Sequence, residues 1–278
     1  MSDRDPDPRL ARITVYPVKS LDGVDLDGAW FVSGGALEHD RTYALVDADG
    51  GYVNGKRERR VHRLRSEFDV ESRTLELSAP DRESTAFDLT RDESGDPQDT
   101  GALTEWLSAY FGYPVSLRHD RTHGFPDDTD ASGPTVISTA TIREVASWYP
   151  DISPDEMRRR LRANLEIGGV PAFWEDTLFD DRDHVVSFTV GDVEFEGVNP
   201  CQRCIVPSRD PDTGEETAGF RRRFVTRREE TMPPWSGGDW FDHTFRVMVN
   251  TRVEAVGREP SVSVGDPVTV GETRPADR

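Results

Sequence analysis

Short runs in which polar and apolar residues alternate recur along most of the chain, and they limit the possible folds more than any other feature of the sequence. The alternation is clear at residues 12–15, and again at 186–190 and 193–195 on either side of the turn signal Gly191-Asp192. A period of two places the apolar side chains on one face of a β-strand. We therefore expect a mostly β fold, with further strands near residues 30–32, 43–46, 52–53, 114–117, 135–137, 165–167, 245–249, 252–256 and 261–270, and several between 68 and 89.

Three other segments carry the signals of α-helices. Gly112, a residue type that commonly ends helices, follows five apolar residues at helical spacing: Leu103, Trp106, Leu107, Tyr110 and Phe111. Ser138 or Thr139 should cap a second helix, and a capping box that begins at Ser153 should start a third. Many strands with a few helices predict an α+β fold that is mostly β.

The chain has a formal net charge of -19, and Lys19 and Lys56 are its only lysines. An acidic, arginine-rich surface stays hydrated at high salt, which suggests a halophilic host. The same charge opposes binding to nucleic acid or anionic lipid, because both need clustered positive charge. No apolar run is long enough to cross a membrane, and the first residues lack an apolar signal core. We therefore expect a cytoplasmic protein that binds neither nucleic acid nor a membrane.

Both cysteines, Cys201 and Cys204, lie in one segment at residues 200–208. Four interpretations compete: a zinc site, a redox dithiol, two small buried hydrophobic residues, and a single thiolate bound to a metal cofactor. Zinc would need two histidines at no recognisable spacing, and Pro207 disfavours the helix that a redox dithiol normally begins. The last two interpretations therefore remain the stronger ones.

Positively charged residues stand at strand ends in the first half of the chain. Lys19 and Ser20 follow the expected strand at 12–15, where a lysine and a hydroxyl suit a phosphate group. Arg41 precedes the strand at 43–46, where a guanidinium could bind an anion with two hydrogen bonds. Exposed lysines and arginines that bind nothing are common at such positions, so this alternative stays open.

The stretch CQRCIVPSRDPDTG at residues 201–214, with VGDPV at 264–268, resembles the cysteine loop of the MOSC domain, which is named for the C-terminal region of molybdenum cofactor sulfurases. YPVKS at 16–20 and HDRTY at 39–43 are similar to segments of the N-terminal barrel that accompanies this domain in the mitochondrial amidoxime reducing component. Each motif is short, but their order and spacing make the assignment specific.

This resemblance extends from about Arg9 to Val270 and implies a domain organisation. We expect a MOSC N-terminal β-barrel-like domain at residues 9–118 and a MOSC β-barrel domain at 119–272, with a few peripheral helices. The boundary falls in a segment at 119–133 that is polar and rich in Asp, Thr and Gly, which marks either a domain boundary or an active-site loop.

The resemblance also implies a site. Cys204 matches the cysteine whose thiolate binds molybdenum, so it is the expected metal ligand and catalytic residue, with Cys201 in support. The positions that match cofactor-contacting residues are Lys19, Ser20, Arg41, Arg162, Asn164, Gln202, Arg203, Cys204 and Thr244. The family often has serine at the position of Gln202 and tyrosine at that of Thr244, and a further contact is expected near Ser132. The expected cofactor is Mo-molybdopterin, whose negative charge the arginines and the lysine would compensate.

The activity that the resemblance implies is the reduction of N-hydroxylated or N-oxide small molecules. Electrons would come from a separate ferredoxin-type or flavoprotein-type donor, because the chain lacks the four cysteines of an iron-sulfur domain. Five arginines between Arg221 and Arg228 form either a docking patch for that donor or a solvated helix face. The alternative function is a carrier of the cofactor or of sulfur on Cys204. Pyridoxal phosphate, a further possible cofactor, would require Lys19 or Lys56 to form its Schiff base. We expect the protein to be a monomer.

Overall fold

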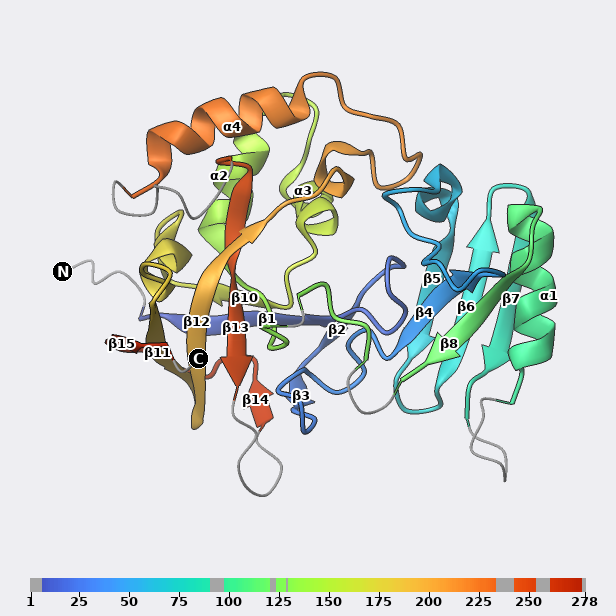
Figure 1. Cartoon of the computed structure of the whole chain (residues 1–278), viewed down its shortest axis with the longest axis horizontal. Coiled ribbons are helices and arrows are strands. Elements are labelled where there is room, and N and C mark those ends of the chain that lie inside the picture. Colours follow the sequence, from blue (N-terminus) through green and yellow to red (C-terminus); the bar gives the residue numbers. More distant parts are fainter. Residues whose placement is uncertain are drawn as a thin grey trace.

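The computed structural model describes residues 7–90, 98–120, 124–128, 130–233, 243–253 and 261–276. Within these ranges the chain forms fifteen strands and four α-helices, so the predicted α+β fold with mostly β-structure is confirmed. Figure 1 shows two groups of elements side by side, a larger one that contains both chain ends and a smaller one built from β4 to β8 and α1.

An eight-stranded sheet organises the larger group. Its strands follow the order β15-β11-β12-β13-β9-β10-β1-β2, and every neighbouring pair is antiparallel except β9 and β10. Strands from the first 26 residues therefore lie in one sheet with strands from the second half, because β1 pairs with both β2 and β10. The eight strands are β1 (Arg9–Val15), β2 (Val24–Leu26), β9 (Val136–Ser138), β10 (Leu165–Gly168), β11 (His184–Val190), β12 (Val193–Gln202), β13 (Arg246–Val253) and β15 (Val268–Pro275).

The predicted hairpin of β11 and β12 shows how the alternating pattern is used. Phe188 and Phe195 pair across the two strands, and their buried rings stack with centroids 5.0 Å apart. Burial of such a side chain stabilises the fold by roughly 1.5–3 kcal/mol. At Gly197 a Cβ atom would lie 1.6 Å from the backbone oxygen of Leu178, so only glycine lets the neighbouring segment approach β12 this closely.

The division of the last strands was predicted wrongly. The strands expected at 245–249 and 252–256 are one strand, β13, as far as the described residues extend, and residues 254–256 lie outside them. The polar residues between the two expected strands do not form a turn, since both find partners. Asn250 Nδ2 donates to a side-chain oxygen on β12 at 2.9 Å, and Thr251 Oγ1 donates to the backbone oxygen of Pro134 at 2.7 Å.

Three further strand predictions differ from the structure. The strand expected at 261–270 is interrupted at Gly265, whose φ of 102° favours a turn, and is divided into β14 (Ser261–Ser263) and the start of β15. At 52–53 a single bridge joins Tyr52 to Val46 and no strand forms. The strand expected at 30–32 is shifted, because β3 (Gly28–Trp30) ends at Trp30 and pairs with β14.

The smaller group has its own hydrophobic core. Leu103, Leu107 and Phe111 are buried on one face of α1, and Gly112 ends the helix in the left-handed region, as predicted. The elements of this group are β4 (Tyr43–Asp47), β5 (Arg65–Asp69), β6 (Thr74–Ala79), β7 (Arg82–Asp88), α1 (Thr100–Phe111) and β8 (Val115–His119), with a short 3-10 helix at Arg59–Arg63. Strand β4 pairs with β8, and β5, β6 and β7 form a three-stranded sheet.

Three helices gather on one side of the eight-stranded sheet (Figure 1). They are α2 (Thr139–Ser147), α3 (Pro154–Leu161) and α4 (Phe220–Thr231), and two more 3-10 helices span Trp174–Leu178 and Val206–Ser208. Ser138 caps α2 and Ser153 caps α3, each by accepting a backbone N–H bond, so both predicted helix starts are confirmed. A third core cluster joins these helices to β13.

Arg228 does not belong to a solvated face of α4 or to a surface patch. Its side chain is 1% exposed and pairs with Asp176, 5% exposed, at 2.5 Å. The guanidinium also lies 4.6 Å from the ring centroid of Phe173. The other arginines of the predicted cluster are exposed on α4: Arg221, Arg222, Arg223 and Arg227.

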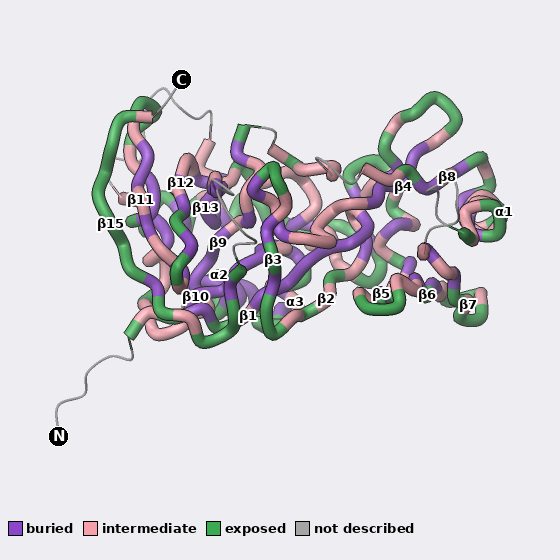
Figure 2. The backbone as a smooth tube through the Cα atoms, turned by 90° about the horizontal axis from the view of Figure 1, so that it is seen from below, coloured by how far each residue is buried: buried purple, intermediate pink, exposed green. Residues whose placement is uncertain are grey.

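Exposure follows the position of each strand in the large sheet. Figure 2 shows the edge strand β15 as mostly exposed, whereas β13 in the interior is almost entirely buried. Among the described residues, no helix has both the length and the apolar character needed to cross a membrane.

Candidate functional site

A cavity of about 740 Å³ lies where the two groups of elements meet. It is lined by both cysteines and by seven of the other predicted site residues: Lys19, Ser20, Arg41, Arg162, Asn164, Gln202 and Arg203. Ser132, the expected position of a further contact, also lines it. Thr244 is not among the lining residues, and its buried Oγ1 has no hydrogen-bond partner among the described residues.

The cavity is positively charged although the protein is strongly acidic. Among the described residues that line it, twelve are lysine or arginine, including both lysines of the chain, and five are aspartate. Low-dielectric walls of one charge sign raise the local concentration of oppositely charged ligands. The cavity is therefore suited to a ligand with several negative charges.

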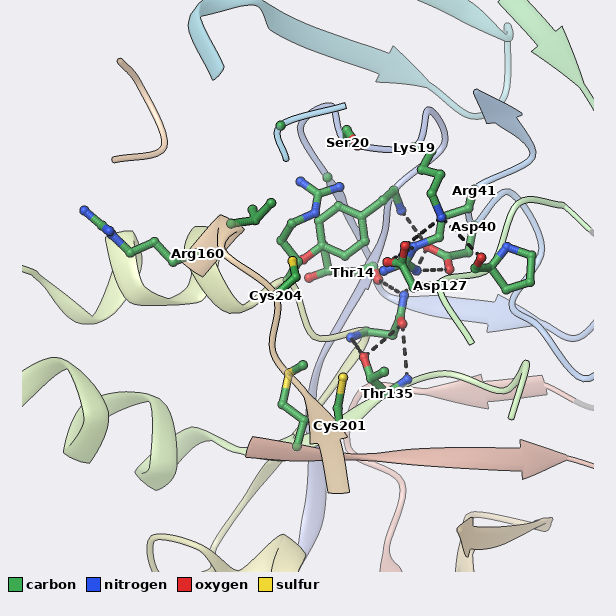
Figure 3. Close-up of a pocket in the computed structure, with 18 of the residues that line it drawn as sticks. Thr14, Lys19, Ser20, Asp40, Arg41, Asp127, Thr135, Arg160, Cys201 and Cys204 are labelled. Atoms are coloured by element: carbon green, nitrogen blue, oxygen red, sulfur yellow. Dashed lines mark hydrogen bonds and ion pairs between the residues drawn. The ribbon is translucent and has the colours of Figure 1, made fainter. Parts of the chain in front are cut away.

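One end of the cavity is a cluster of ion pairs, which Figure 3 shows around Lys19 and Arg41. Lys19 Nζ lies 2.6 Å from Asp127 Oδ1 and also donates to the backbone oxygen of Phe125 at 2.8 Å. Arg41 pairs with Asp40, and its Nε lies 3.6 Å from Asp127 Oδ2. A single carboxylate, that of Asp127, therefore bridges the two cations.

The pKa shifts in this cluster follow from burial and pairing. Burial lowers the pKa of Lys19, against the attraction of Asp127. Burial opposes the charge of Arg41, and partial desolvation in the cavity opposes that of the otherwise exposed Asp127, but their mutual attraction and the further partners Asp40 and Lys19 outweigh both effects. As a result the pKa of Arg41 is raised and that of Asp127 is held well below its usual range, so both groups stay ionised.

Arg162 contributes a cation without an anionic partner. It ends α3 in the left-handed conformation, with φ of 57°, and its guanidinium lies 4.0 Å from the ring centroid of Tyr16. Among the described residues no group accepts a hydrogen bond from this guanidinium, and its Nη2 is buried. Burial lowers the pKa of Arg162, and the nearby charge of Arg41 adds to this effect.

The ring of Tyr16 contacts two of these arginines. The Arg41 guanidinium lies 5.2 Å from its ring centroid, in addition to that of Arg162. The Tyr16 hydroxyl donates to the backbone oxygen of Ala163 at 3.2 Å, and burial raises its pKa to about 12. The phenol therefore stays neutral, and its ring provides a fixed surface for both cations.

Asn164 is a positioning residue in this arrangement. Its Nδ2 donates to Thr14 O and to Asp40 Oδ1, both at 3.1 Å, and its Oδ1 accepts from Thr135 N at 3.2 Å. The side chain is buried and its donors are occupied within the protein. It fixes Asp40, which in turn pairs with Arg41.

The two cysteines lie in different surroundings. Both are free thiols, and Cys201 packs at the edge of the third core cluster, whereas Cys204 follows the end of β12 in the loop. Arg203 Nη1 donates to Cys201 Sγ at 3.1 Å and Nη2 donates to Leu161 O at 2.9 Å, while its buried Nε has no partner among the described residues. In the described part of the chain no three His, Cys, Asp or Glu side chains are grouped as metal ligands, which leaves the zinc interpretation without support.

Backbone strain is concentrated at this cavity. Ser20, Arg41, Arg162 and Met248 all line it, and all have positive φ values between 51° and 76°. Such conformations cost non-glycine residues of order 1–3 kcal/mol each and persist where the surrounding structure enforces them. The sequence carries no signal for this strain or for the role of Asp127. Tyr16 and Asp40 lie in the motifs at 16–20 and 39–43, but their roles depend on contacts between distant segments and were not predicted.

Two family models match the chain. The model of the MOSC N-terminal beta barrel domain matches residues 7–113, and that of the MOSC domain matches residues 129–269. The chain belongs to the MOSC domain family. The position of the boundary between the domains that we predicted at 118–119 stays a prediction.

Two relatives of this MOSC protein share about a quarter of their aligned residues with it. Molybdenum cofactor sulfurase of Drosophila yakuba is 26% identical over 234 residues, which are 76% of this chain and 29% of that protein. Mitochondrial amidoxime-reducing component 1 of Homo sapiens is 24% identical over 236 residues, which are 74% of this chain and 67% of that protein. The chain thus spans less than a third of the sulfurase. The crystal structure of the YUAD protein from Bacillus subtilis aligns with a TM-score of 0.39 and 13% identity, over 95% of this chain and 96% of that chain.

Proposed function

We propose that the protein binds a molybdenum cofactor of the molybdopterin type and reduces N-hydroxylated or N-oxide small molecules. The observation that carries this proposal is the set of buried guanidinium nitrogens in the cavity without partners among the described residues: Arg162 Nη2, Arg203 Nε and Arg209 Nε. Burial of unpaired cationic groups is costly. A polyanionic ligand beside Cys204 would provide the missing partners.

The side chains of the cavity fit such a cofactor. Lys19 and Arg41 would hold its phosphate, Arg162 and Arg203 would compensate further negative charge, and the Cys204 thiolate is a soft ligand of the kind that suits molybdenum. When bound, the cofactor would supply the two-electron chemistry, while the protein supplies orientation and electrostatics. The matching positions in the family support the same assignment, although Gln202 and Thr244 differ from the usual serine and tyrosine.

The chain's own residues prepare this site before any ligand binds. Asn164 orients Asp40, and Asp40 orients Arg41, so this cation is held at a fixed place. Reduction of an N-hydroxyl group consumes two electrons and two protons and releases water. We propose that a separate ferredoxin-type or flavoprotein-type protein delivers the electrons.

A carrier function is the second candidate, since one of the two relatives is named as a molybdenum cofactor sulfurase and Cys204 could carry sulfur as a persulfide. Pyridoxal phosphate is disfavoured by the contacts of Lys19. Its Nζ has three acceptors within 3.2 Å, in Phe125, Pro126 and Asp127, so it is not free to form a Schiff base.

Substitution of the two cysteines tests the proposal. Cys204→Ser removes the sulfur donor, so we expect loss of N-hydroxyl reduction with an artificial electron donor and an altered molybdenum content or metal spectrum. Cys201→Ala, the matched control, should keep both and lose roughly 1 kcal/mol of stability. Elemental analysis and turnover would be measured on both variants. Equal loss would indicate a dithiol site, and a wild-type protein that contains molybdenum but exchanges it readily without turnover would support the carrier.

A further inference from the structure

We infer that the cavity contains a second anion subsite, centred on Arg209, which binds a carboxylate or phosphate group of the small-molecule substrate. The description of this ligand as a substrate rests on the proposed function, whereas the anion subsite itself rests on the geometry. Arg209 lines the cavity but is not one of the positions that match cofactor contacts in the family. It lies five residues after Cys204 in the same loop.

The guanidinium of Arg209 is held in place but not neutralised. Its Nη1 donates to the backbone oxygen of Gly214 at 3.0 Å, which anchors one side of the group. Its Nε is buried, and among the described residues nothing accepts a hydrogen bond from Nε or Nη2 and no carboxylate forms an ion pair with it. The Nε and Nη2 atoms form the edge with which a guanidinium binds a carboxylate or phosphate through two hydrogen bonds.

The acidic residues closest in sequence are engaged elsewhere. Asp210 Oδ1 accepts backbone N–H bonds from Asp212 and from the next residue, at 2.9 and 2.8 Å, and so closes its own turn. Asp212 pairs with Arg159 at 2.7 Å and with Arg65 at 3.3 Å. Among the described residues neither carboxylate therefore compensates Arg209, and an anion bound in the cavity would supply the missing partner.

The wall beside Arg209 is also positively charged. His62 lines the same cavity, and its Nε2 lies 3.2 Å from the backbone oxygen of Gly55. Burial lowers the pKa of His62, and the charges of Arg209, Arg162 and Arg65 lower it further. Three arginines therefore contribute positive charge to the part of the cavity around His62. Such a field attracts an anion and repels a cationic substrate.

The fold fixes the offset between this subsite and the proposed reaction centre. The 3-10 helix Val206–Ser208 lies between Cys204 and Arg209, and the Arg209 N–H donates to Val206 O at 2.9 Å. A chain spans at most about 3.6 Å per residue, so the Cα atoms of Cys204 and Arg209 lie no more than about 18 Å apart, and the short helix between them reduces this distance. A substrate that reaches both would carry its acidic group at the opposite end of a small molecule from the N-hydroxyl group.

The test compares two substrates that differ by one carboxylate, benzamidoxime and 4-carboxybenzamidoxime, with an artificial electron donor. For the protein loaded with molybdenum, we expect Arg209→Gln to raise KM for the carboxylated compound at least about tenfold and to leave both KM and kcat for the uncharged compound within about twofold. For Arg209→Lys, which keeps the charge, KM for the carboxylated compound should lie between the values of the wild type and Arg209→Gln. Arg143→Gln, an exposed arginine on α2 outside the cavity lining, is the matched control and should change neither.

Titration calorimetry with inorganic phosphate, at the lowest salt that keeps the protein folded, tests the subsite without turnover. We expect the affinity of the loaded protein to fall at least about tenfold in Arg209→Gln and not in Arg143→Gln. Unchanged phosphate binding, or an equal KM effect on the two amidoximes, would overturn the inference. Loss of molybdenum from Arg209→Gln would assign the residue to the cofactor and would overturn it as well. If neither amidoxime is reduced, the proposed function fails, while phosphate binding still decides whether the anion subsite exists.

Discussion

The carboxylate of Asp127 occupies the two cations that an anionic ligand would need at one end of the cavity. It lies 2.6 Å from Lys19 Nζ and 3.6 Å from Arg41 Nε, and Figure 3 shows all three side chains converging. An incoming phosphate must displace this carboxylate or share the cations with it. We therefore predict that Asp127→Asn increases the affinity of the cofactor-free protein for inorganic phosphate and, at the same time, lowers its stability.

The size of the effect follows from exposure and distance. The Asp127 side chain is 63% exposed, so each ion pair is screened by solvent and contributes about 0–1 kcal/mol. With two pairs the total is about 1 kcal/mol, which corresponds to roughly a fivefold change in affinity, since 1.4 kcal/mol is tenfold. Because Lys19 and Arg41 hold the pKa of Asp127 well below its usual range, it stays ionised at and above about pH 5, so titration of Asp127 itself adds no pH dependence to the effect above that pH.

Titration calorimetry of cofactor-free protein with phosphate measures the affinity, and urea unfolding measures the stability. Asp128→Asn is the matched control, because Asp128 also lines the cavity but its Oδ2 accepts from Asn250 at 3.2 Å and it pairs with no cation among the described residues. We expect its phosphate affinity to stay within about twofold of the wild type. Phosphate affinity that is unchanged or reduced in Asp127→Asn would refute the occupation of the anion position by this carboxylate.

Two predictions concern buried charges outside the cavity. Arg228→Met leaves its buried carboxylate partner unpaired and should lower the free energy of unfolding by about 3–5 kcal/mol. Arg227→Met loses only an exposed ion pair and should lower it by about 0.5 kcal/mol or less. Equal losses of the two variants in urea unfolding would contradict this prediction. Burial raises the pKa of Glu175 from 4.5 to about 7, so the native state holds a proton that the unfolded state releases, and stability falls as pH rises between these values. In the wild type this reduces the free energy of unfolding by an amount on the order of 3 kcal/mol, and Glu175→Gln should remove the reduction. Plots of the free energy of unfolding against pH for variant and wild type should therefore diverge from about pH 4.5 to 7 and run parallel above pH 7.

Local signals account for the parts of the fold that the sequence predicts correctly. The starts of α2 and α3 depend on Ser138 and Ser153, whose side chains satisfy backbone N–H groups a few residues away. The end of α1 depends on Gly112, and the hairpin of β11 and β12 on the turn at Gly191. Each of these features is decided within about one helical turn or one hairpin loop, so no knowledge of distant contacts is needed.

The features that the sequence does not predict are those in which a distant segment decides. Arg227 and Arg228 are adjacent arginines on one helix, yet one is exposed and the other is buried against Asp176, 52 residues earlier in the sequence. The continuity of β13 through Asn250 and Thr251 depends in the same way on partners from distant segments, β12 and Pro134. Periodicity reports which side of an element is apolar, but it does not report which charged residue finds a partner there.

The residues of the cavity also differ in how many of their side-chain hydrogen-bond donors remain available to a ligand. Asn164 has its side-chain donors occupied by Thr14 and Asp40, so a motif match alone overstates its freedom to contact a ligand. Arg162 and Arg209 show the opposite case, because their guanidinium groups have no carboxylate partner in the described part of a protein with a net charge of -19. Burial of unpaired cations destabilises the empty protein, and any anion that pairs with them stabilises the folded state by mass action. If the polyanionic ligand proposed above binds beside Cys204, its binding would offset the strain and the unpaired charge of a site formed in advance.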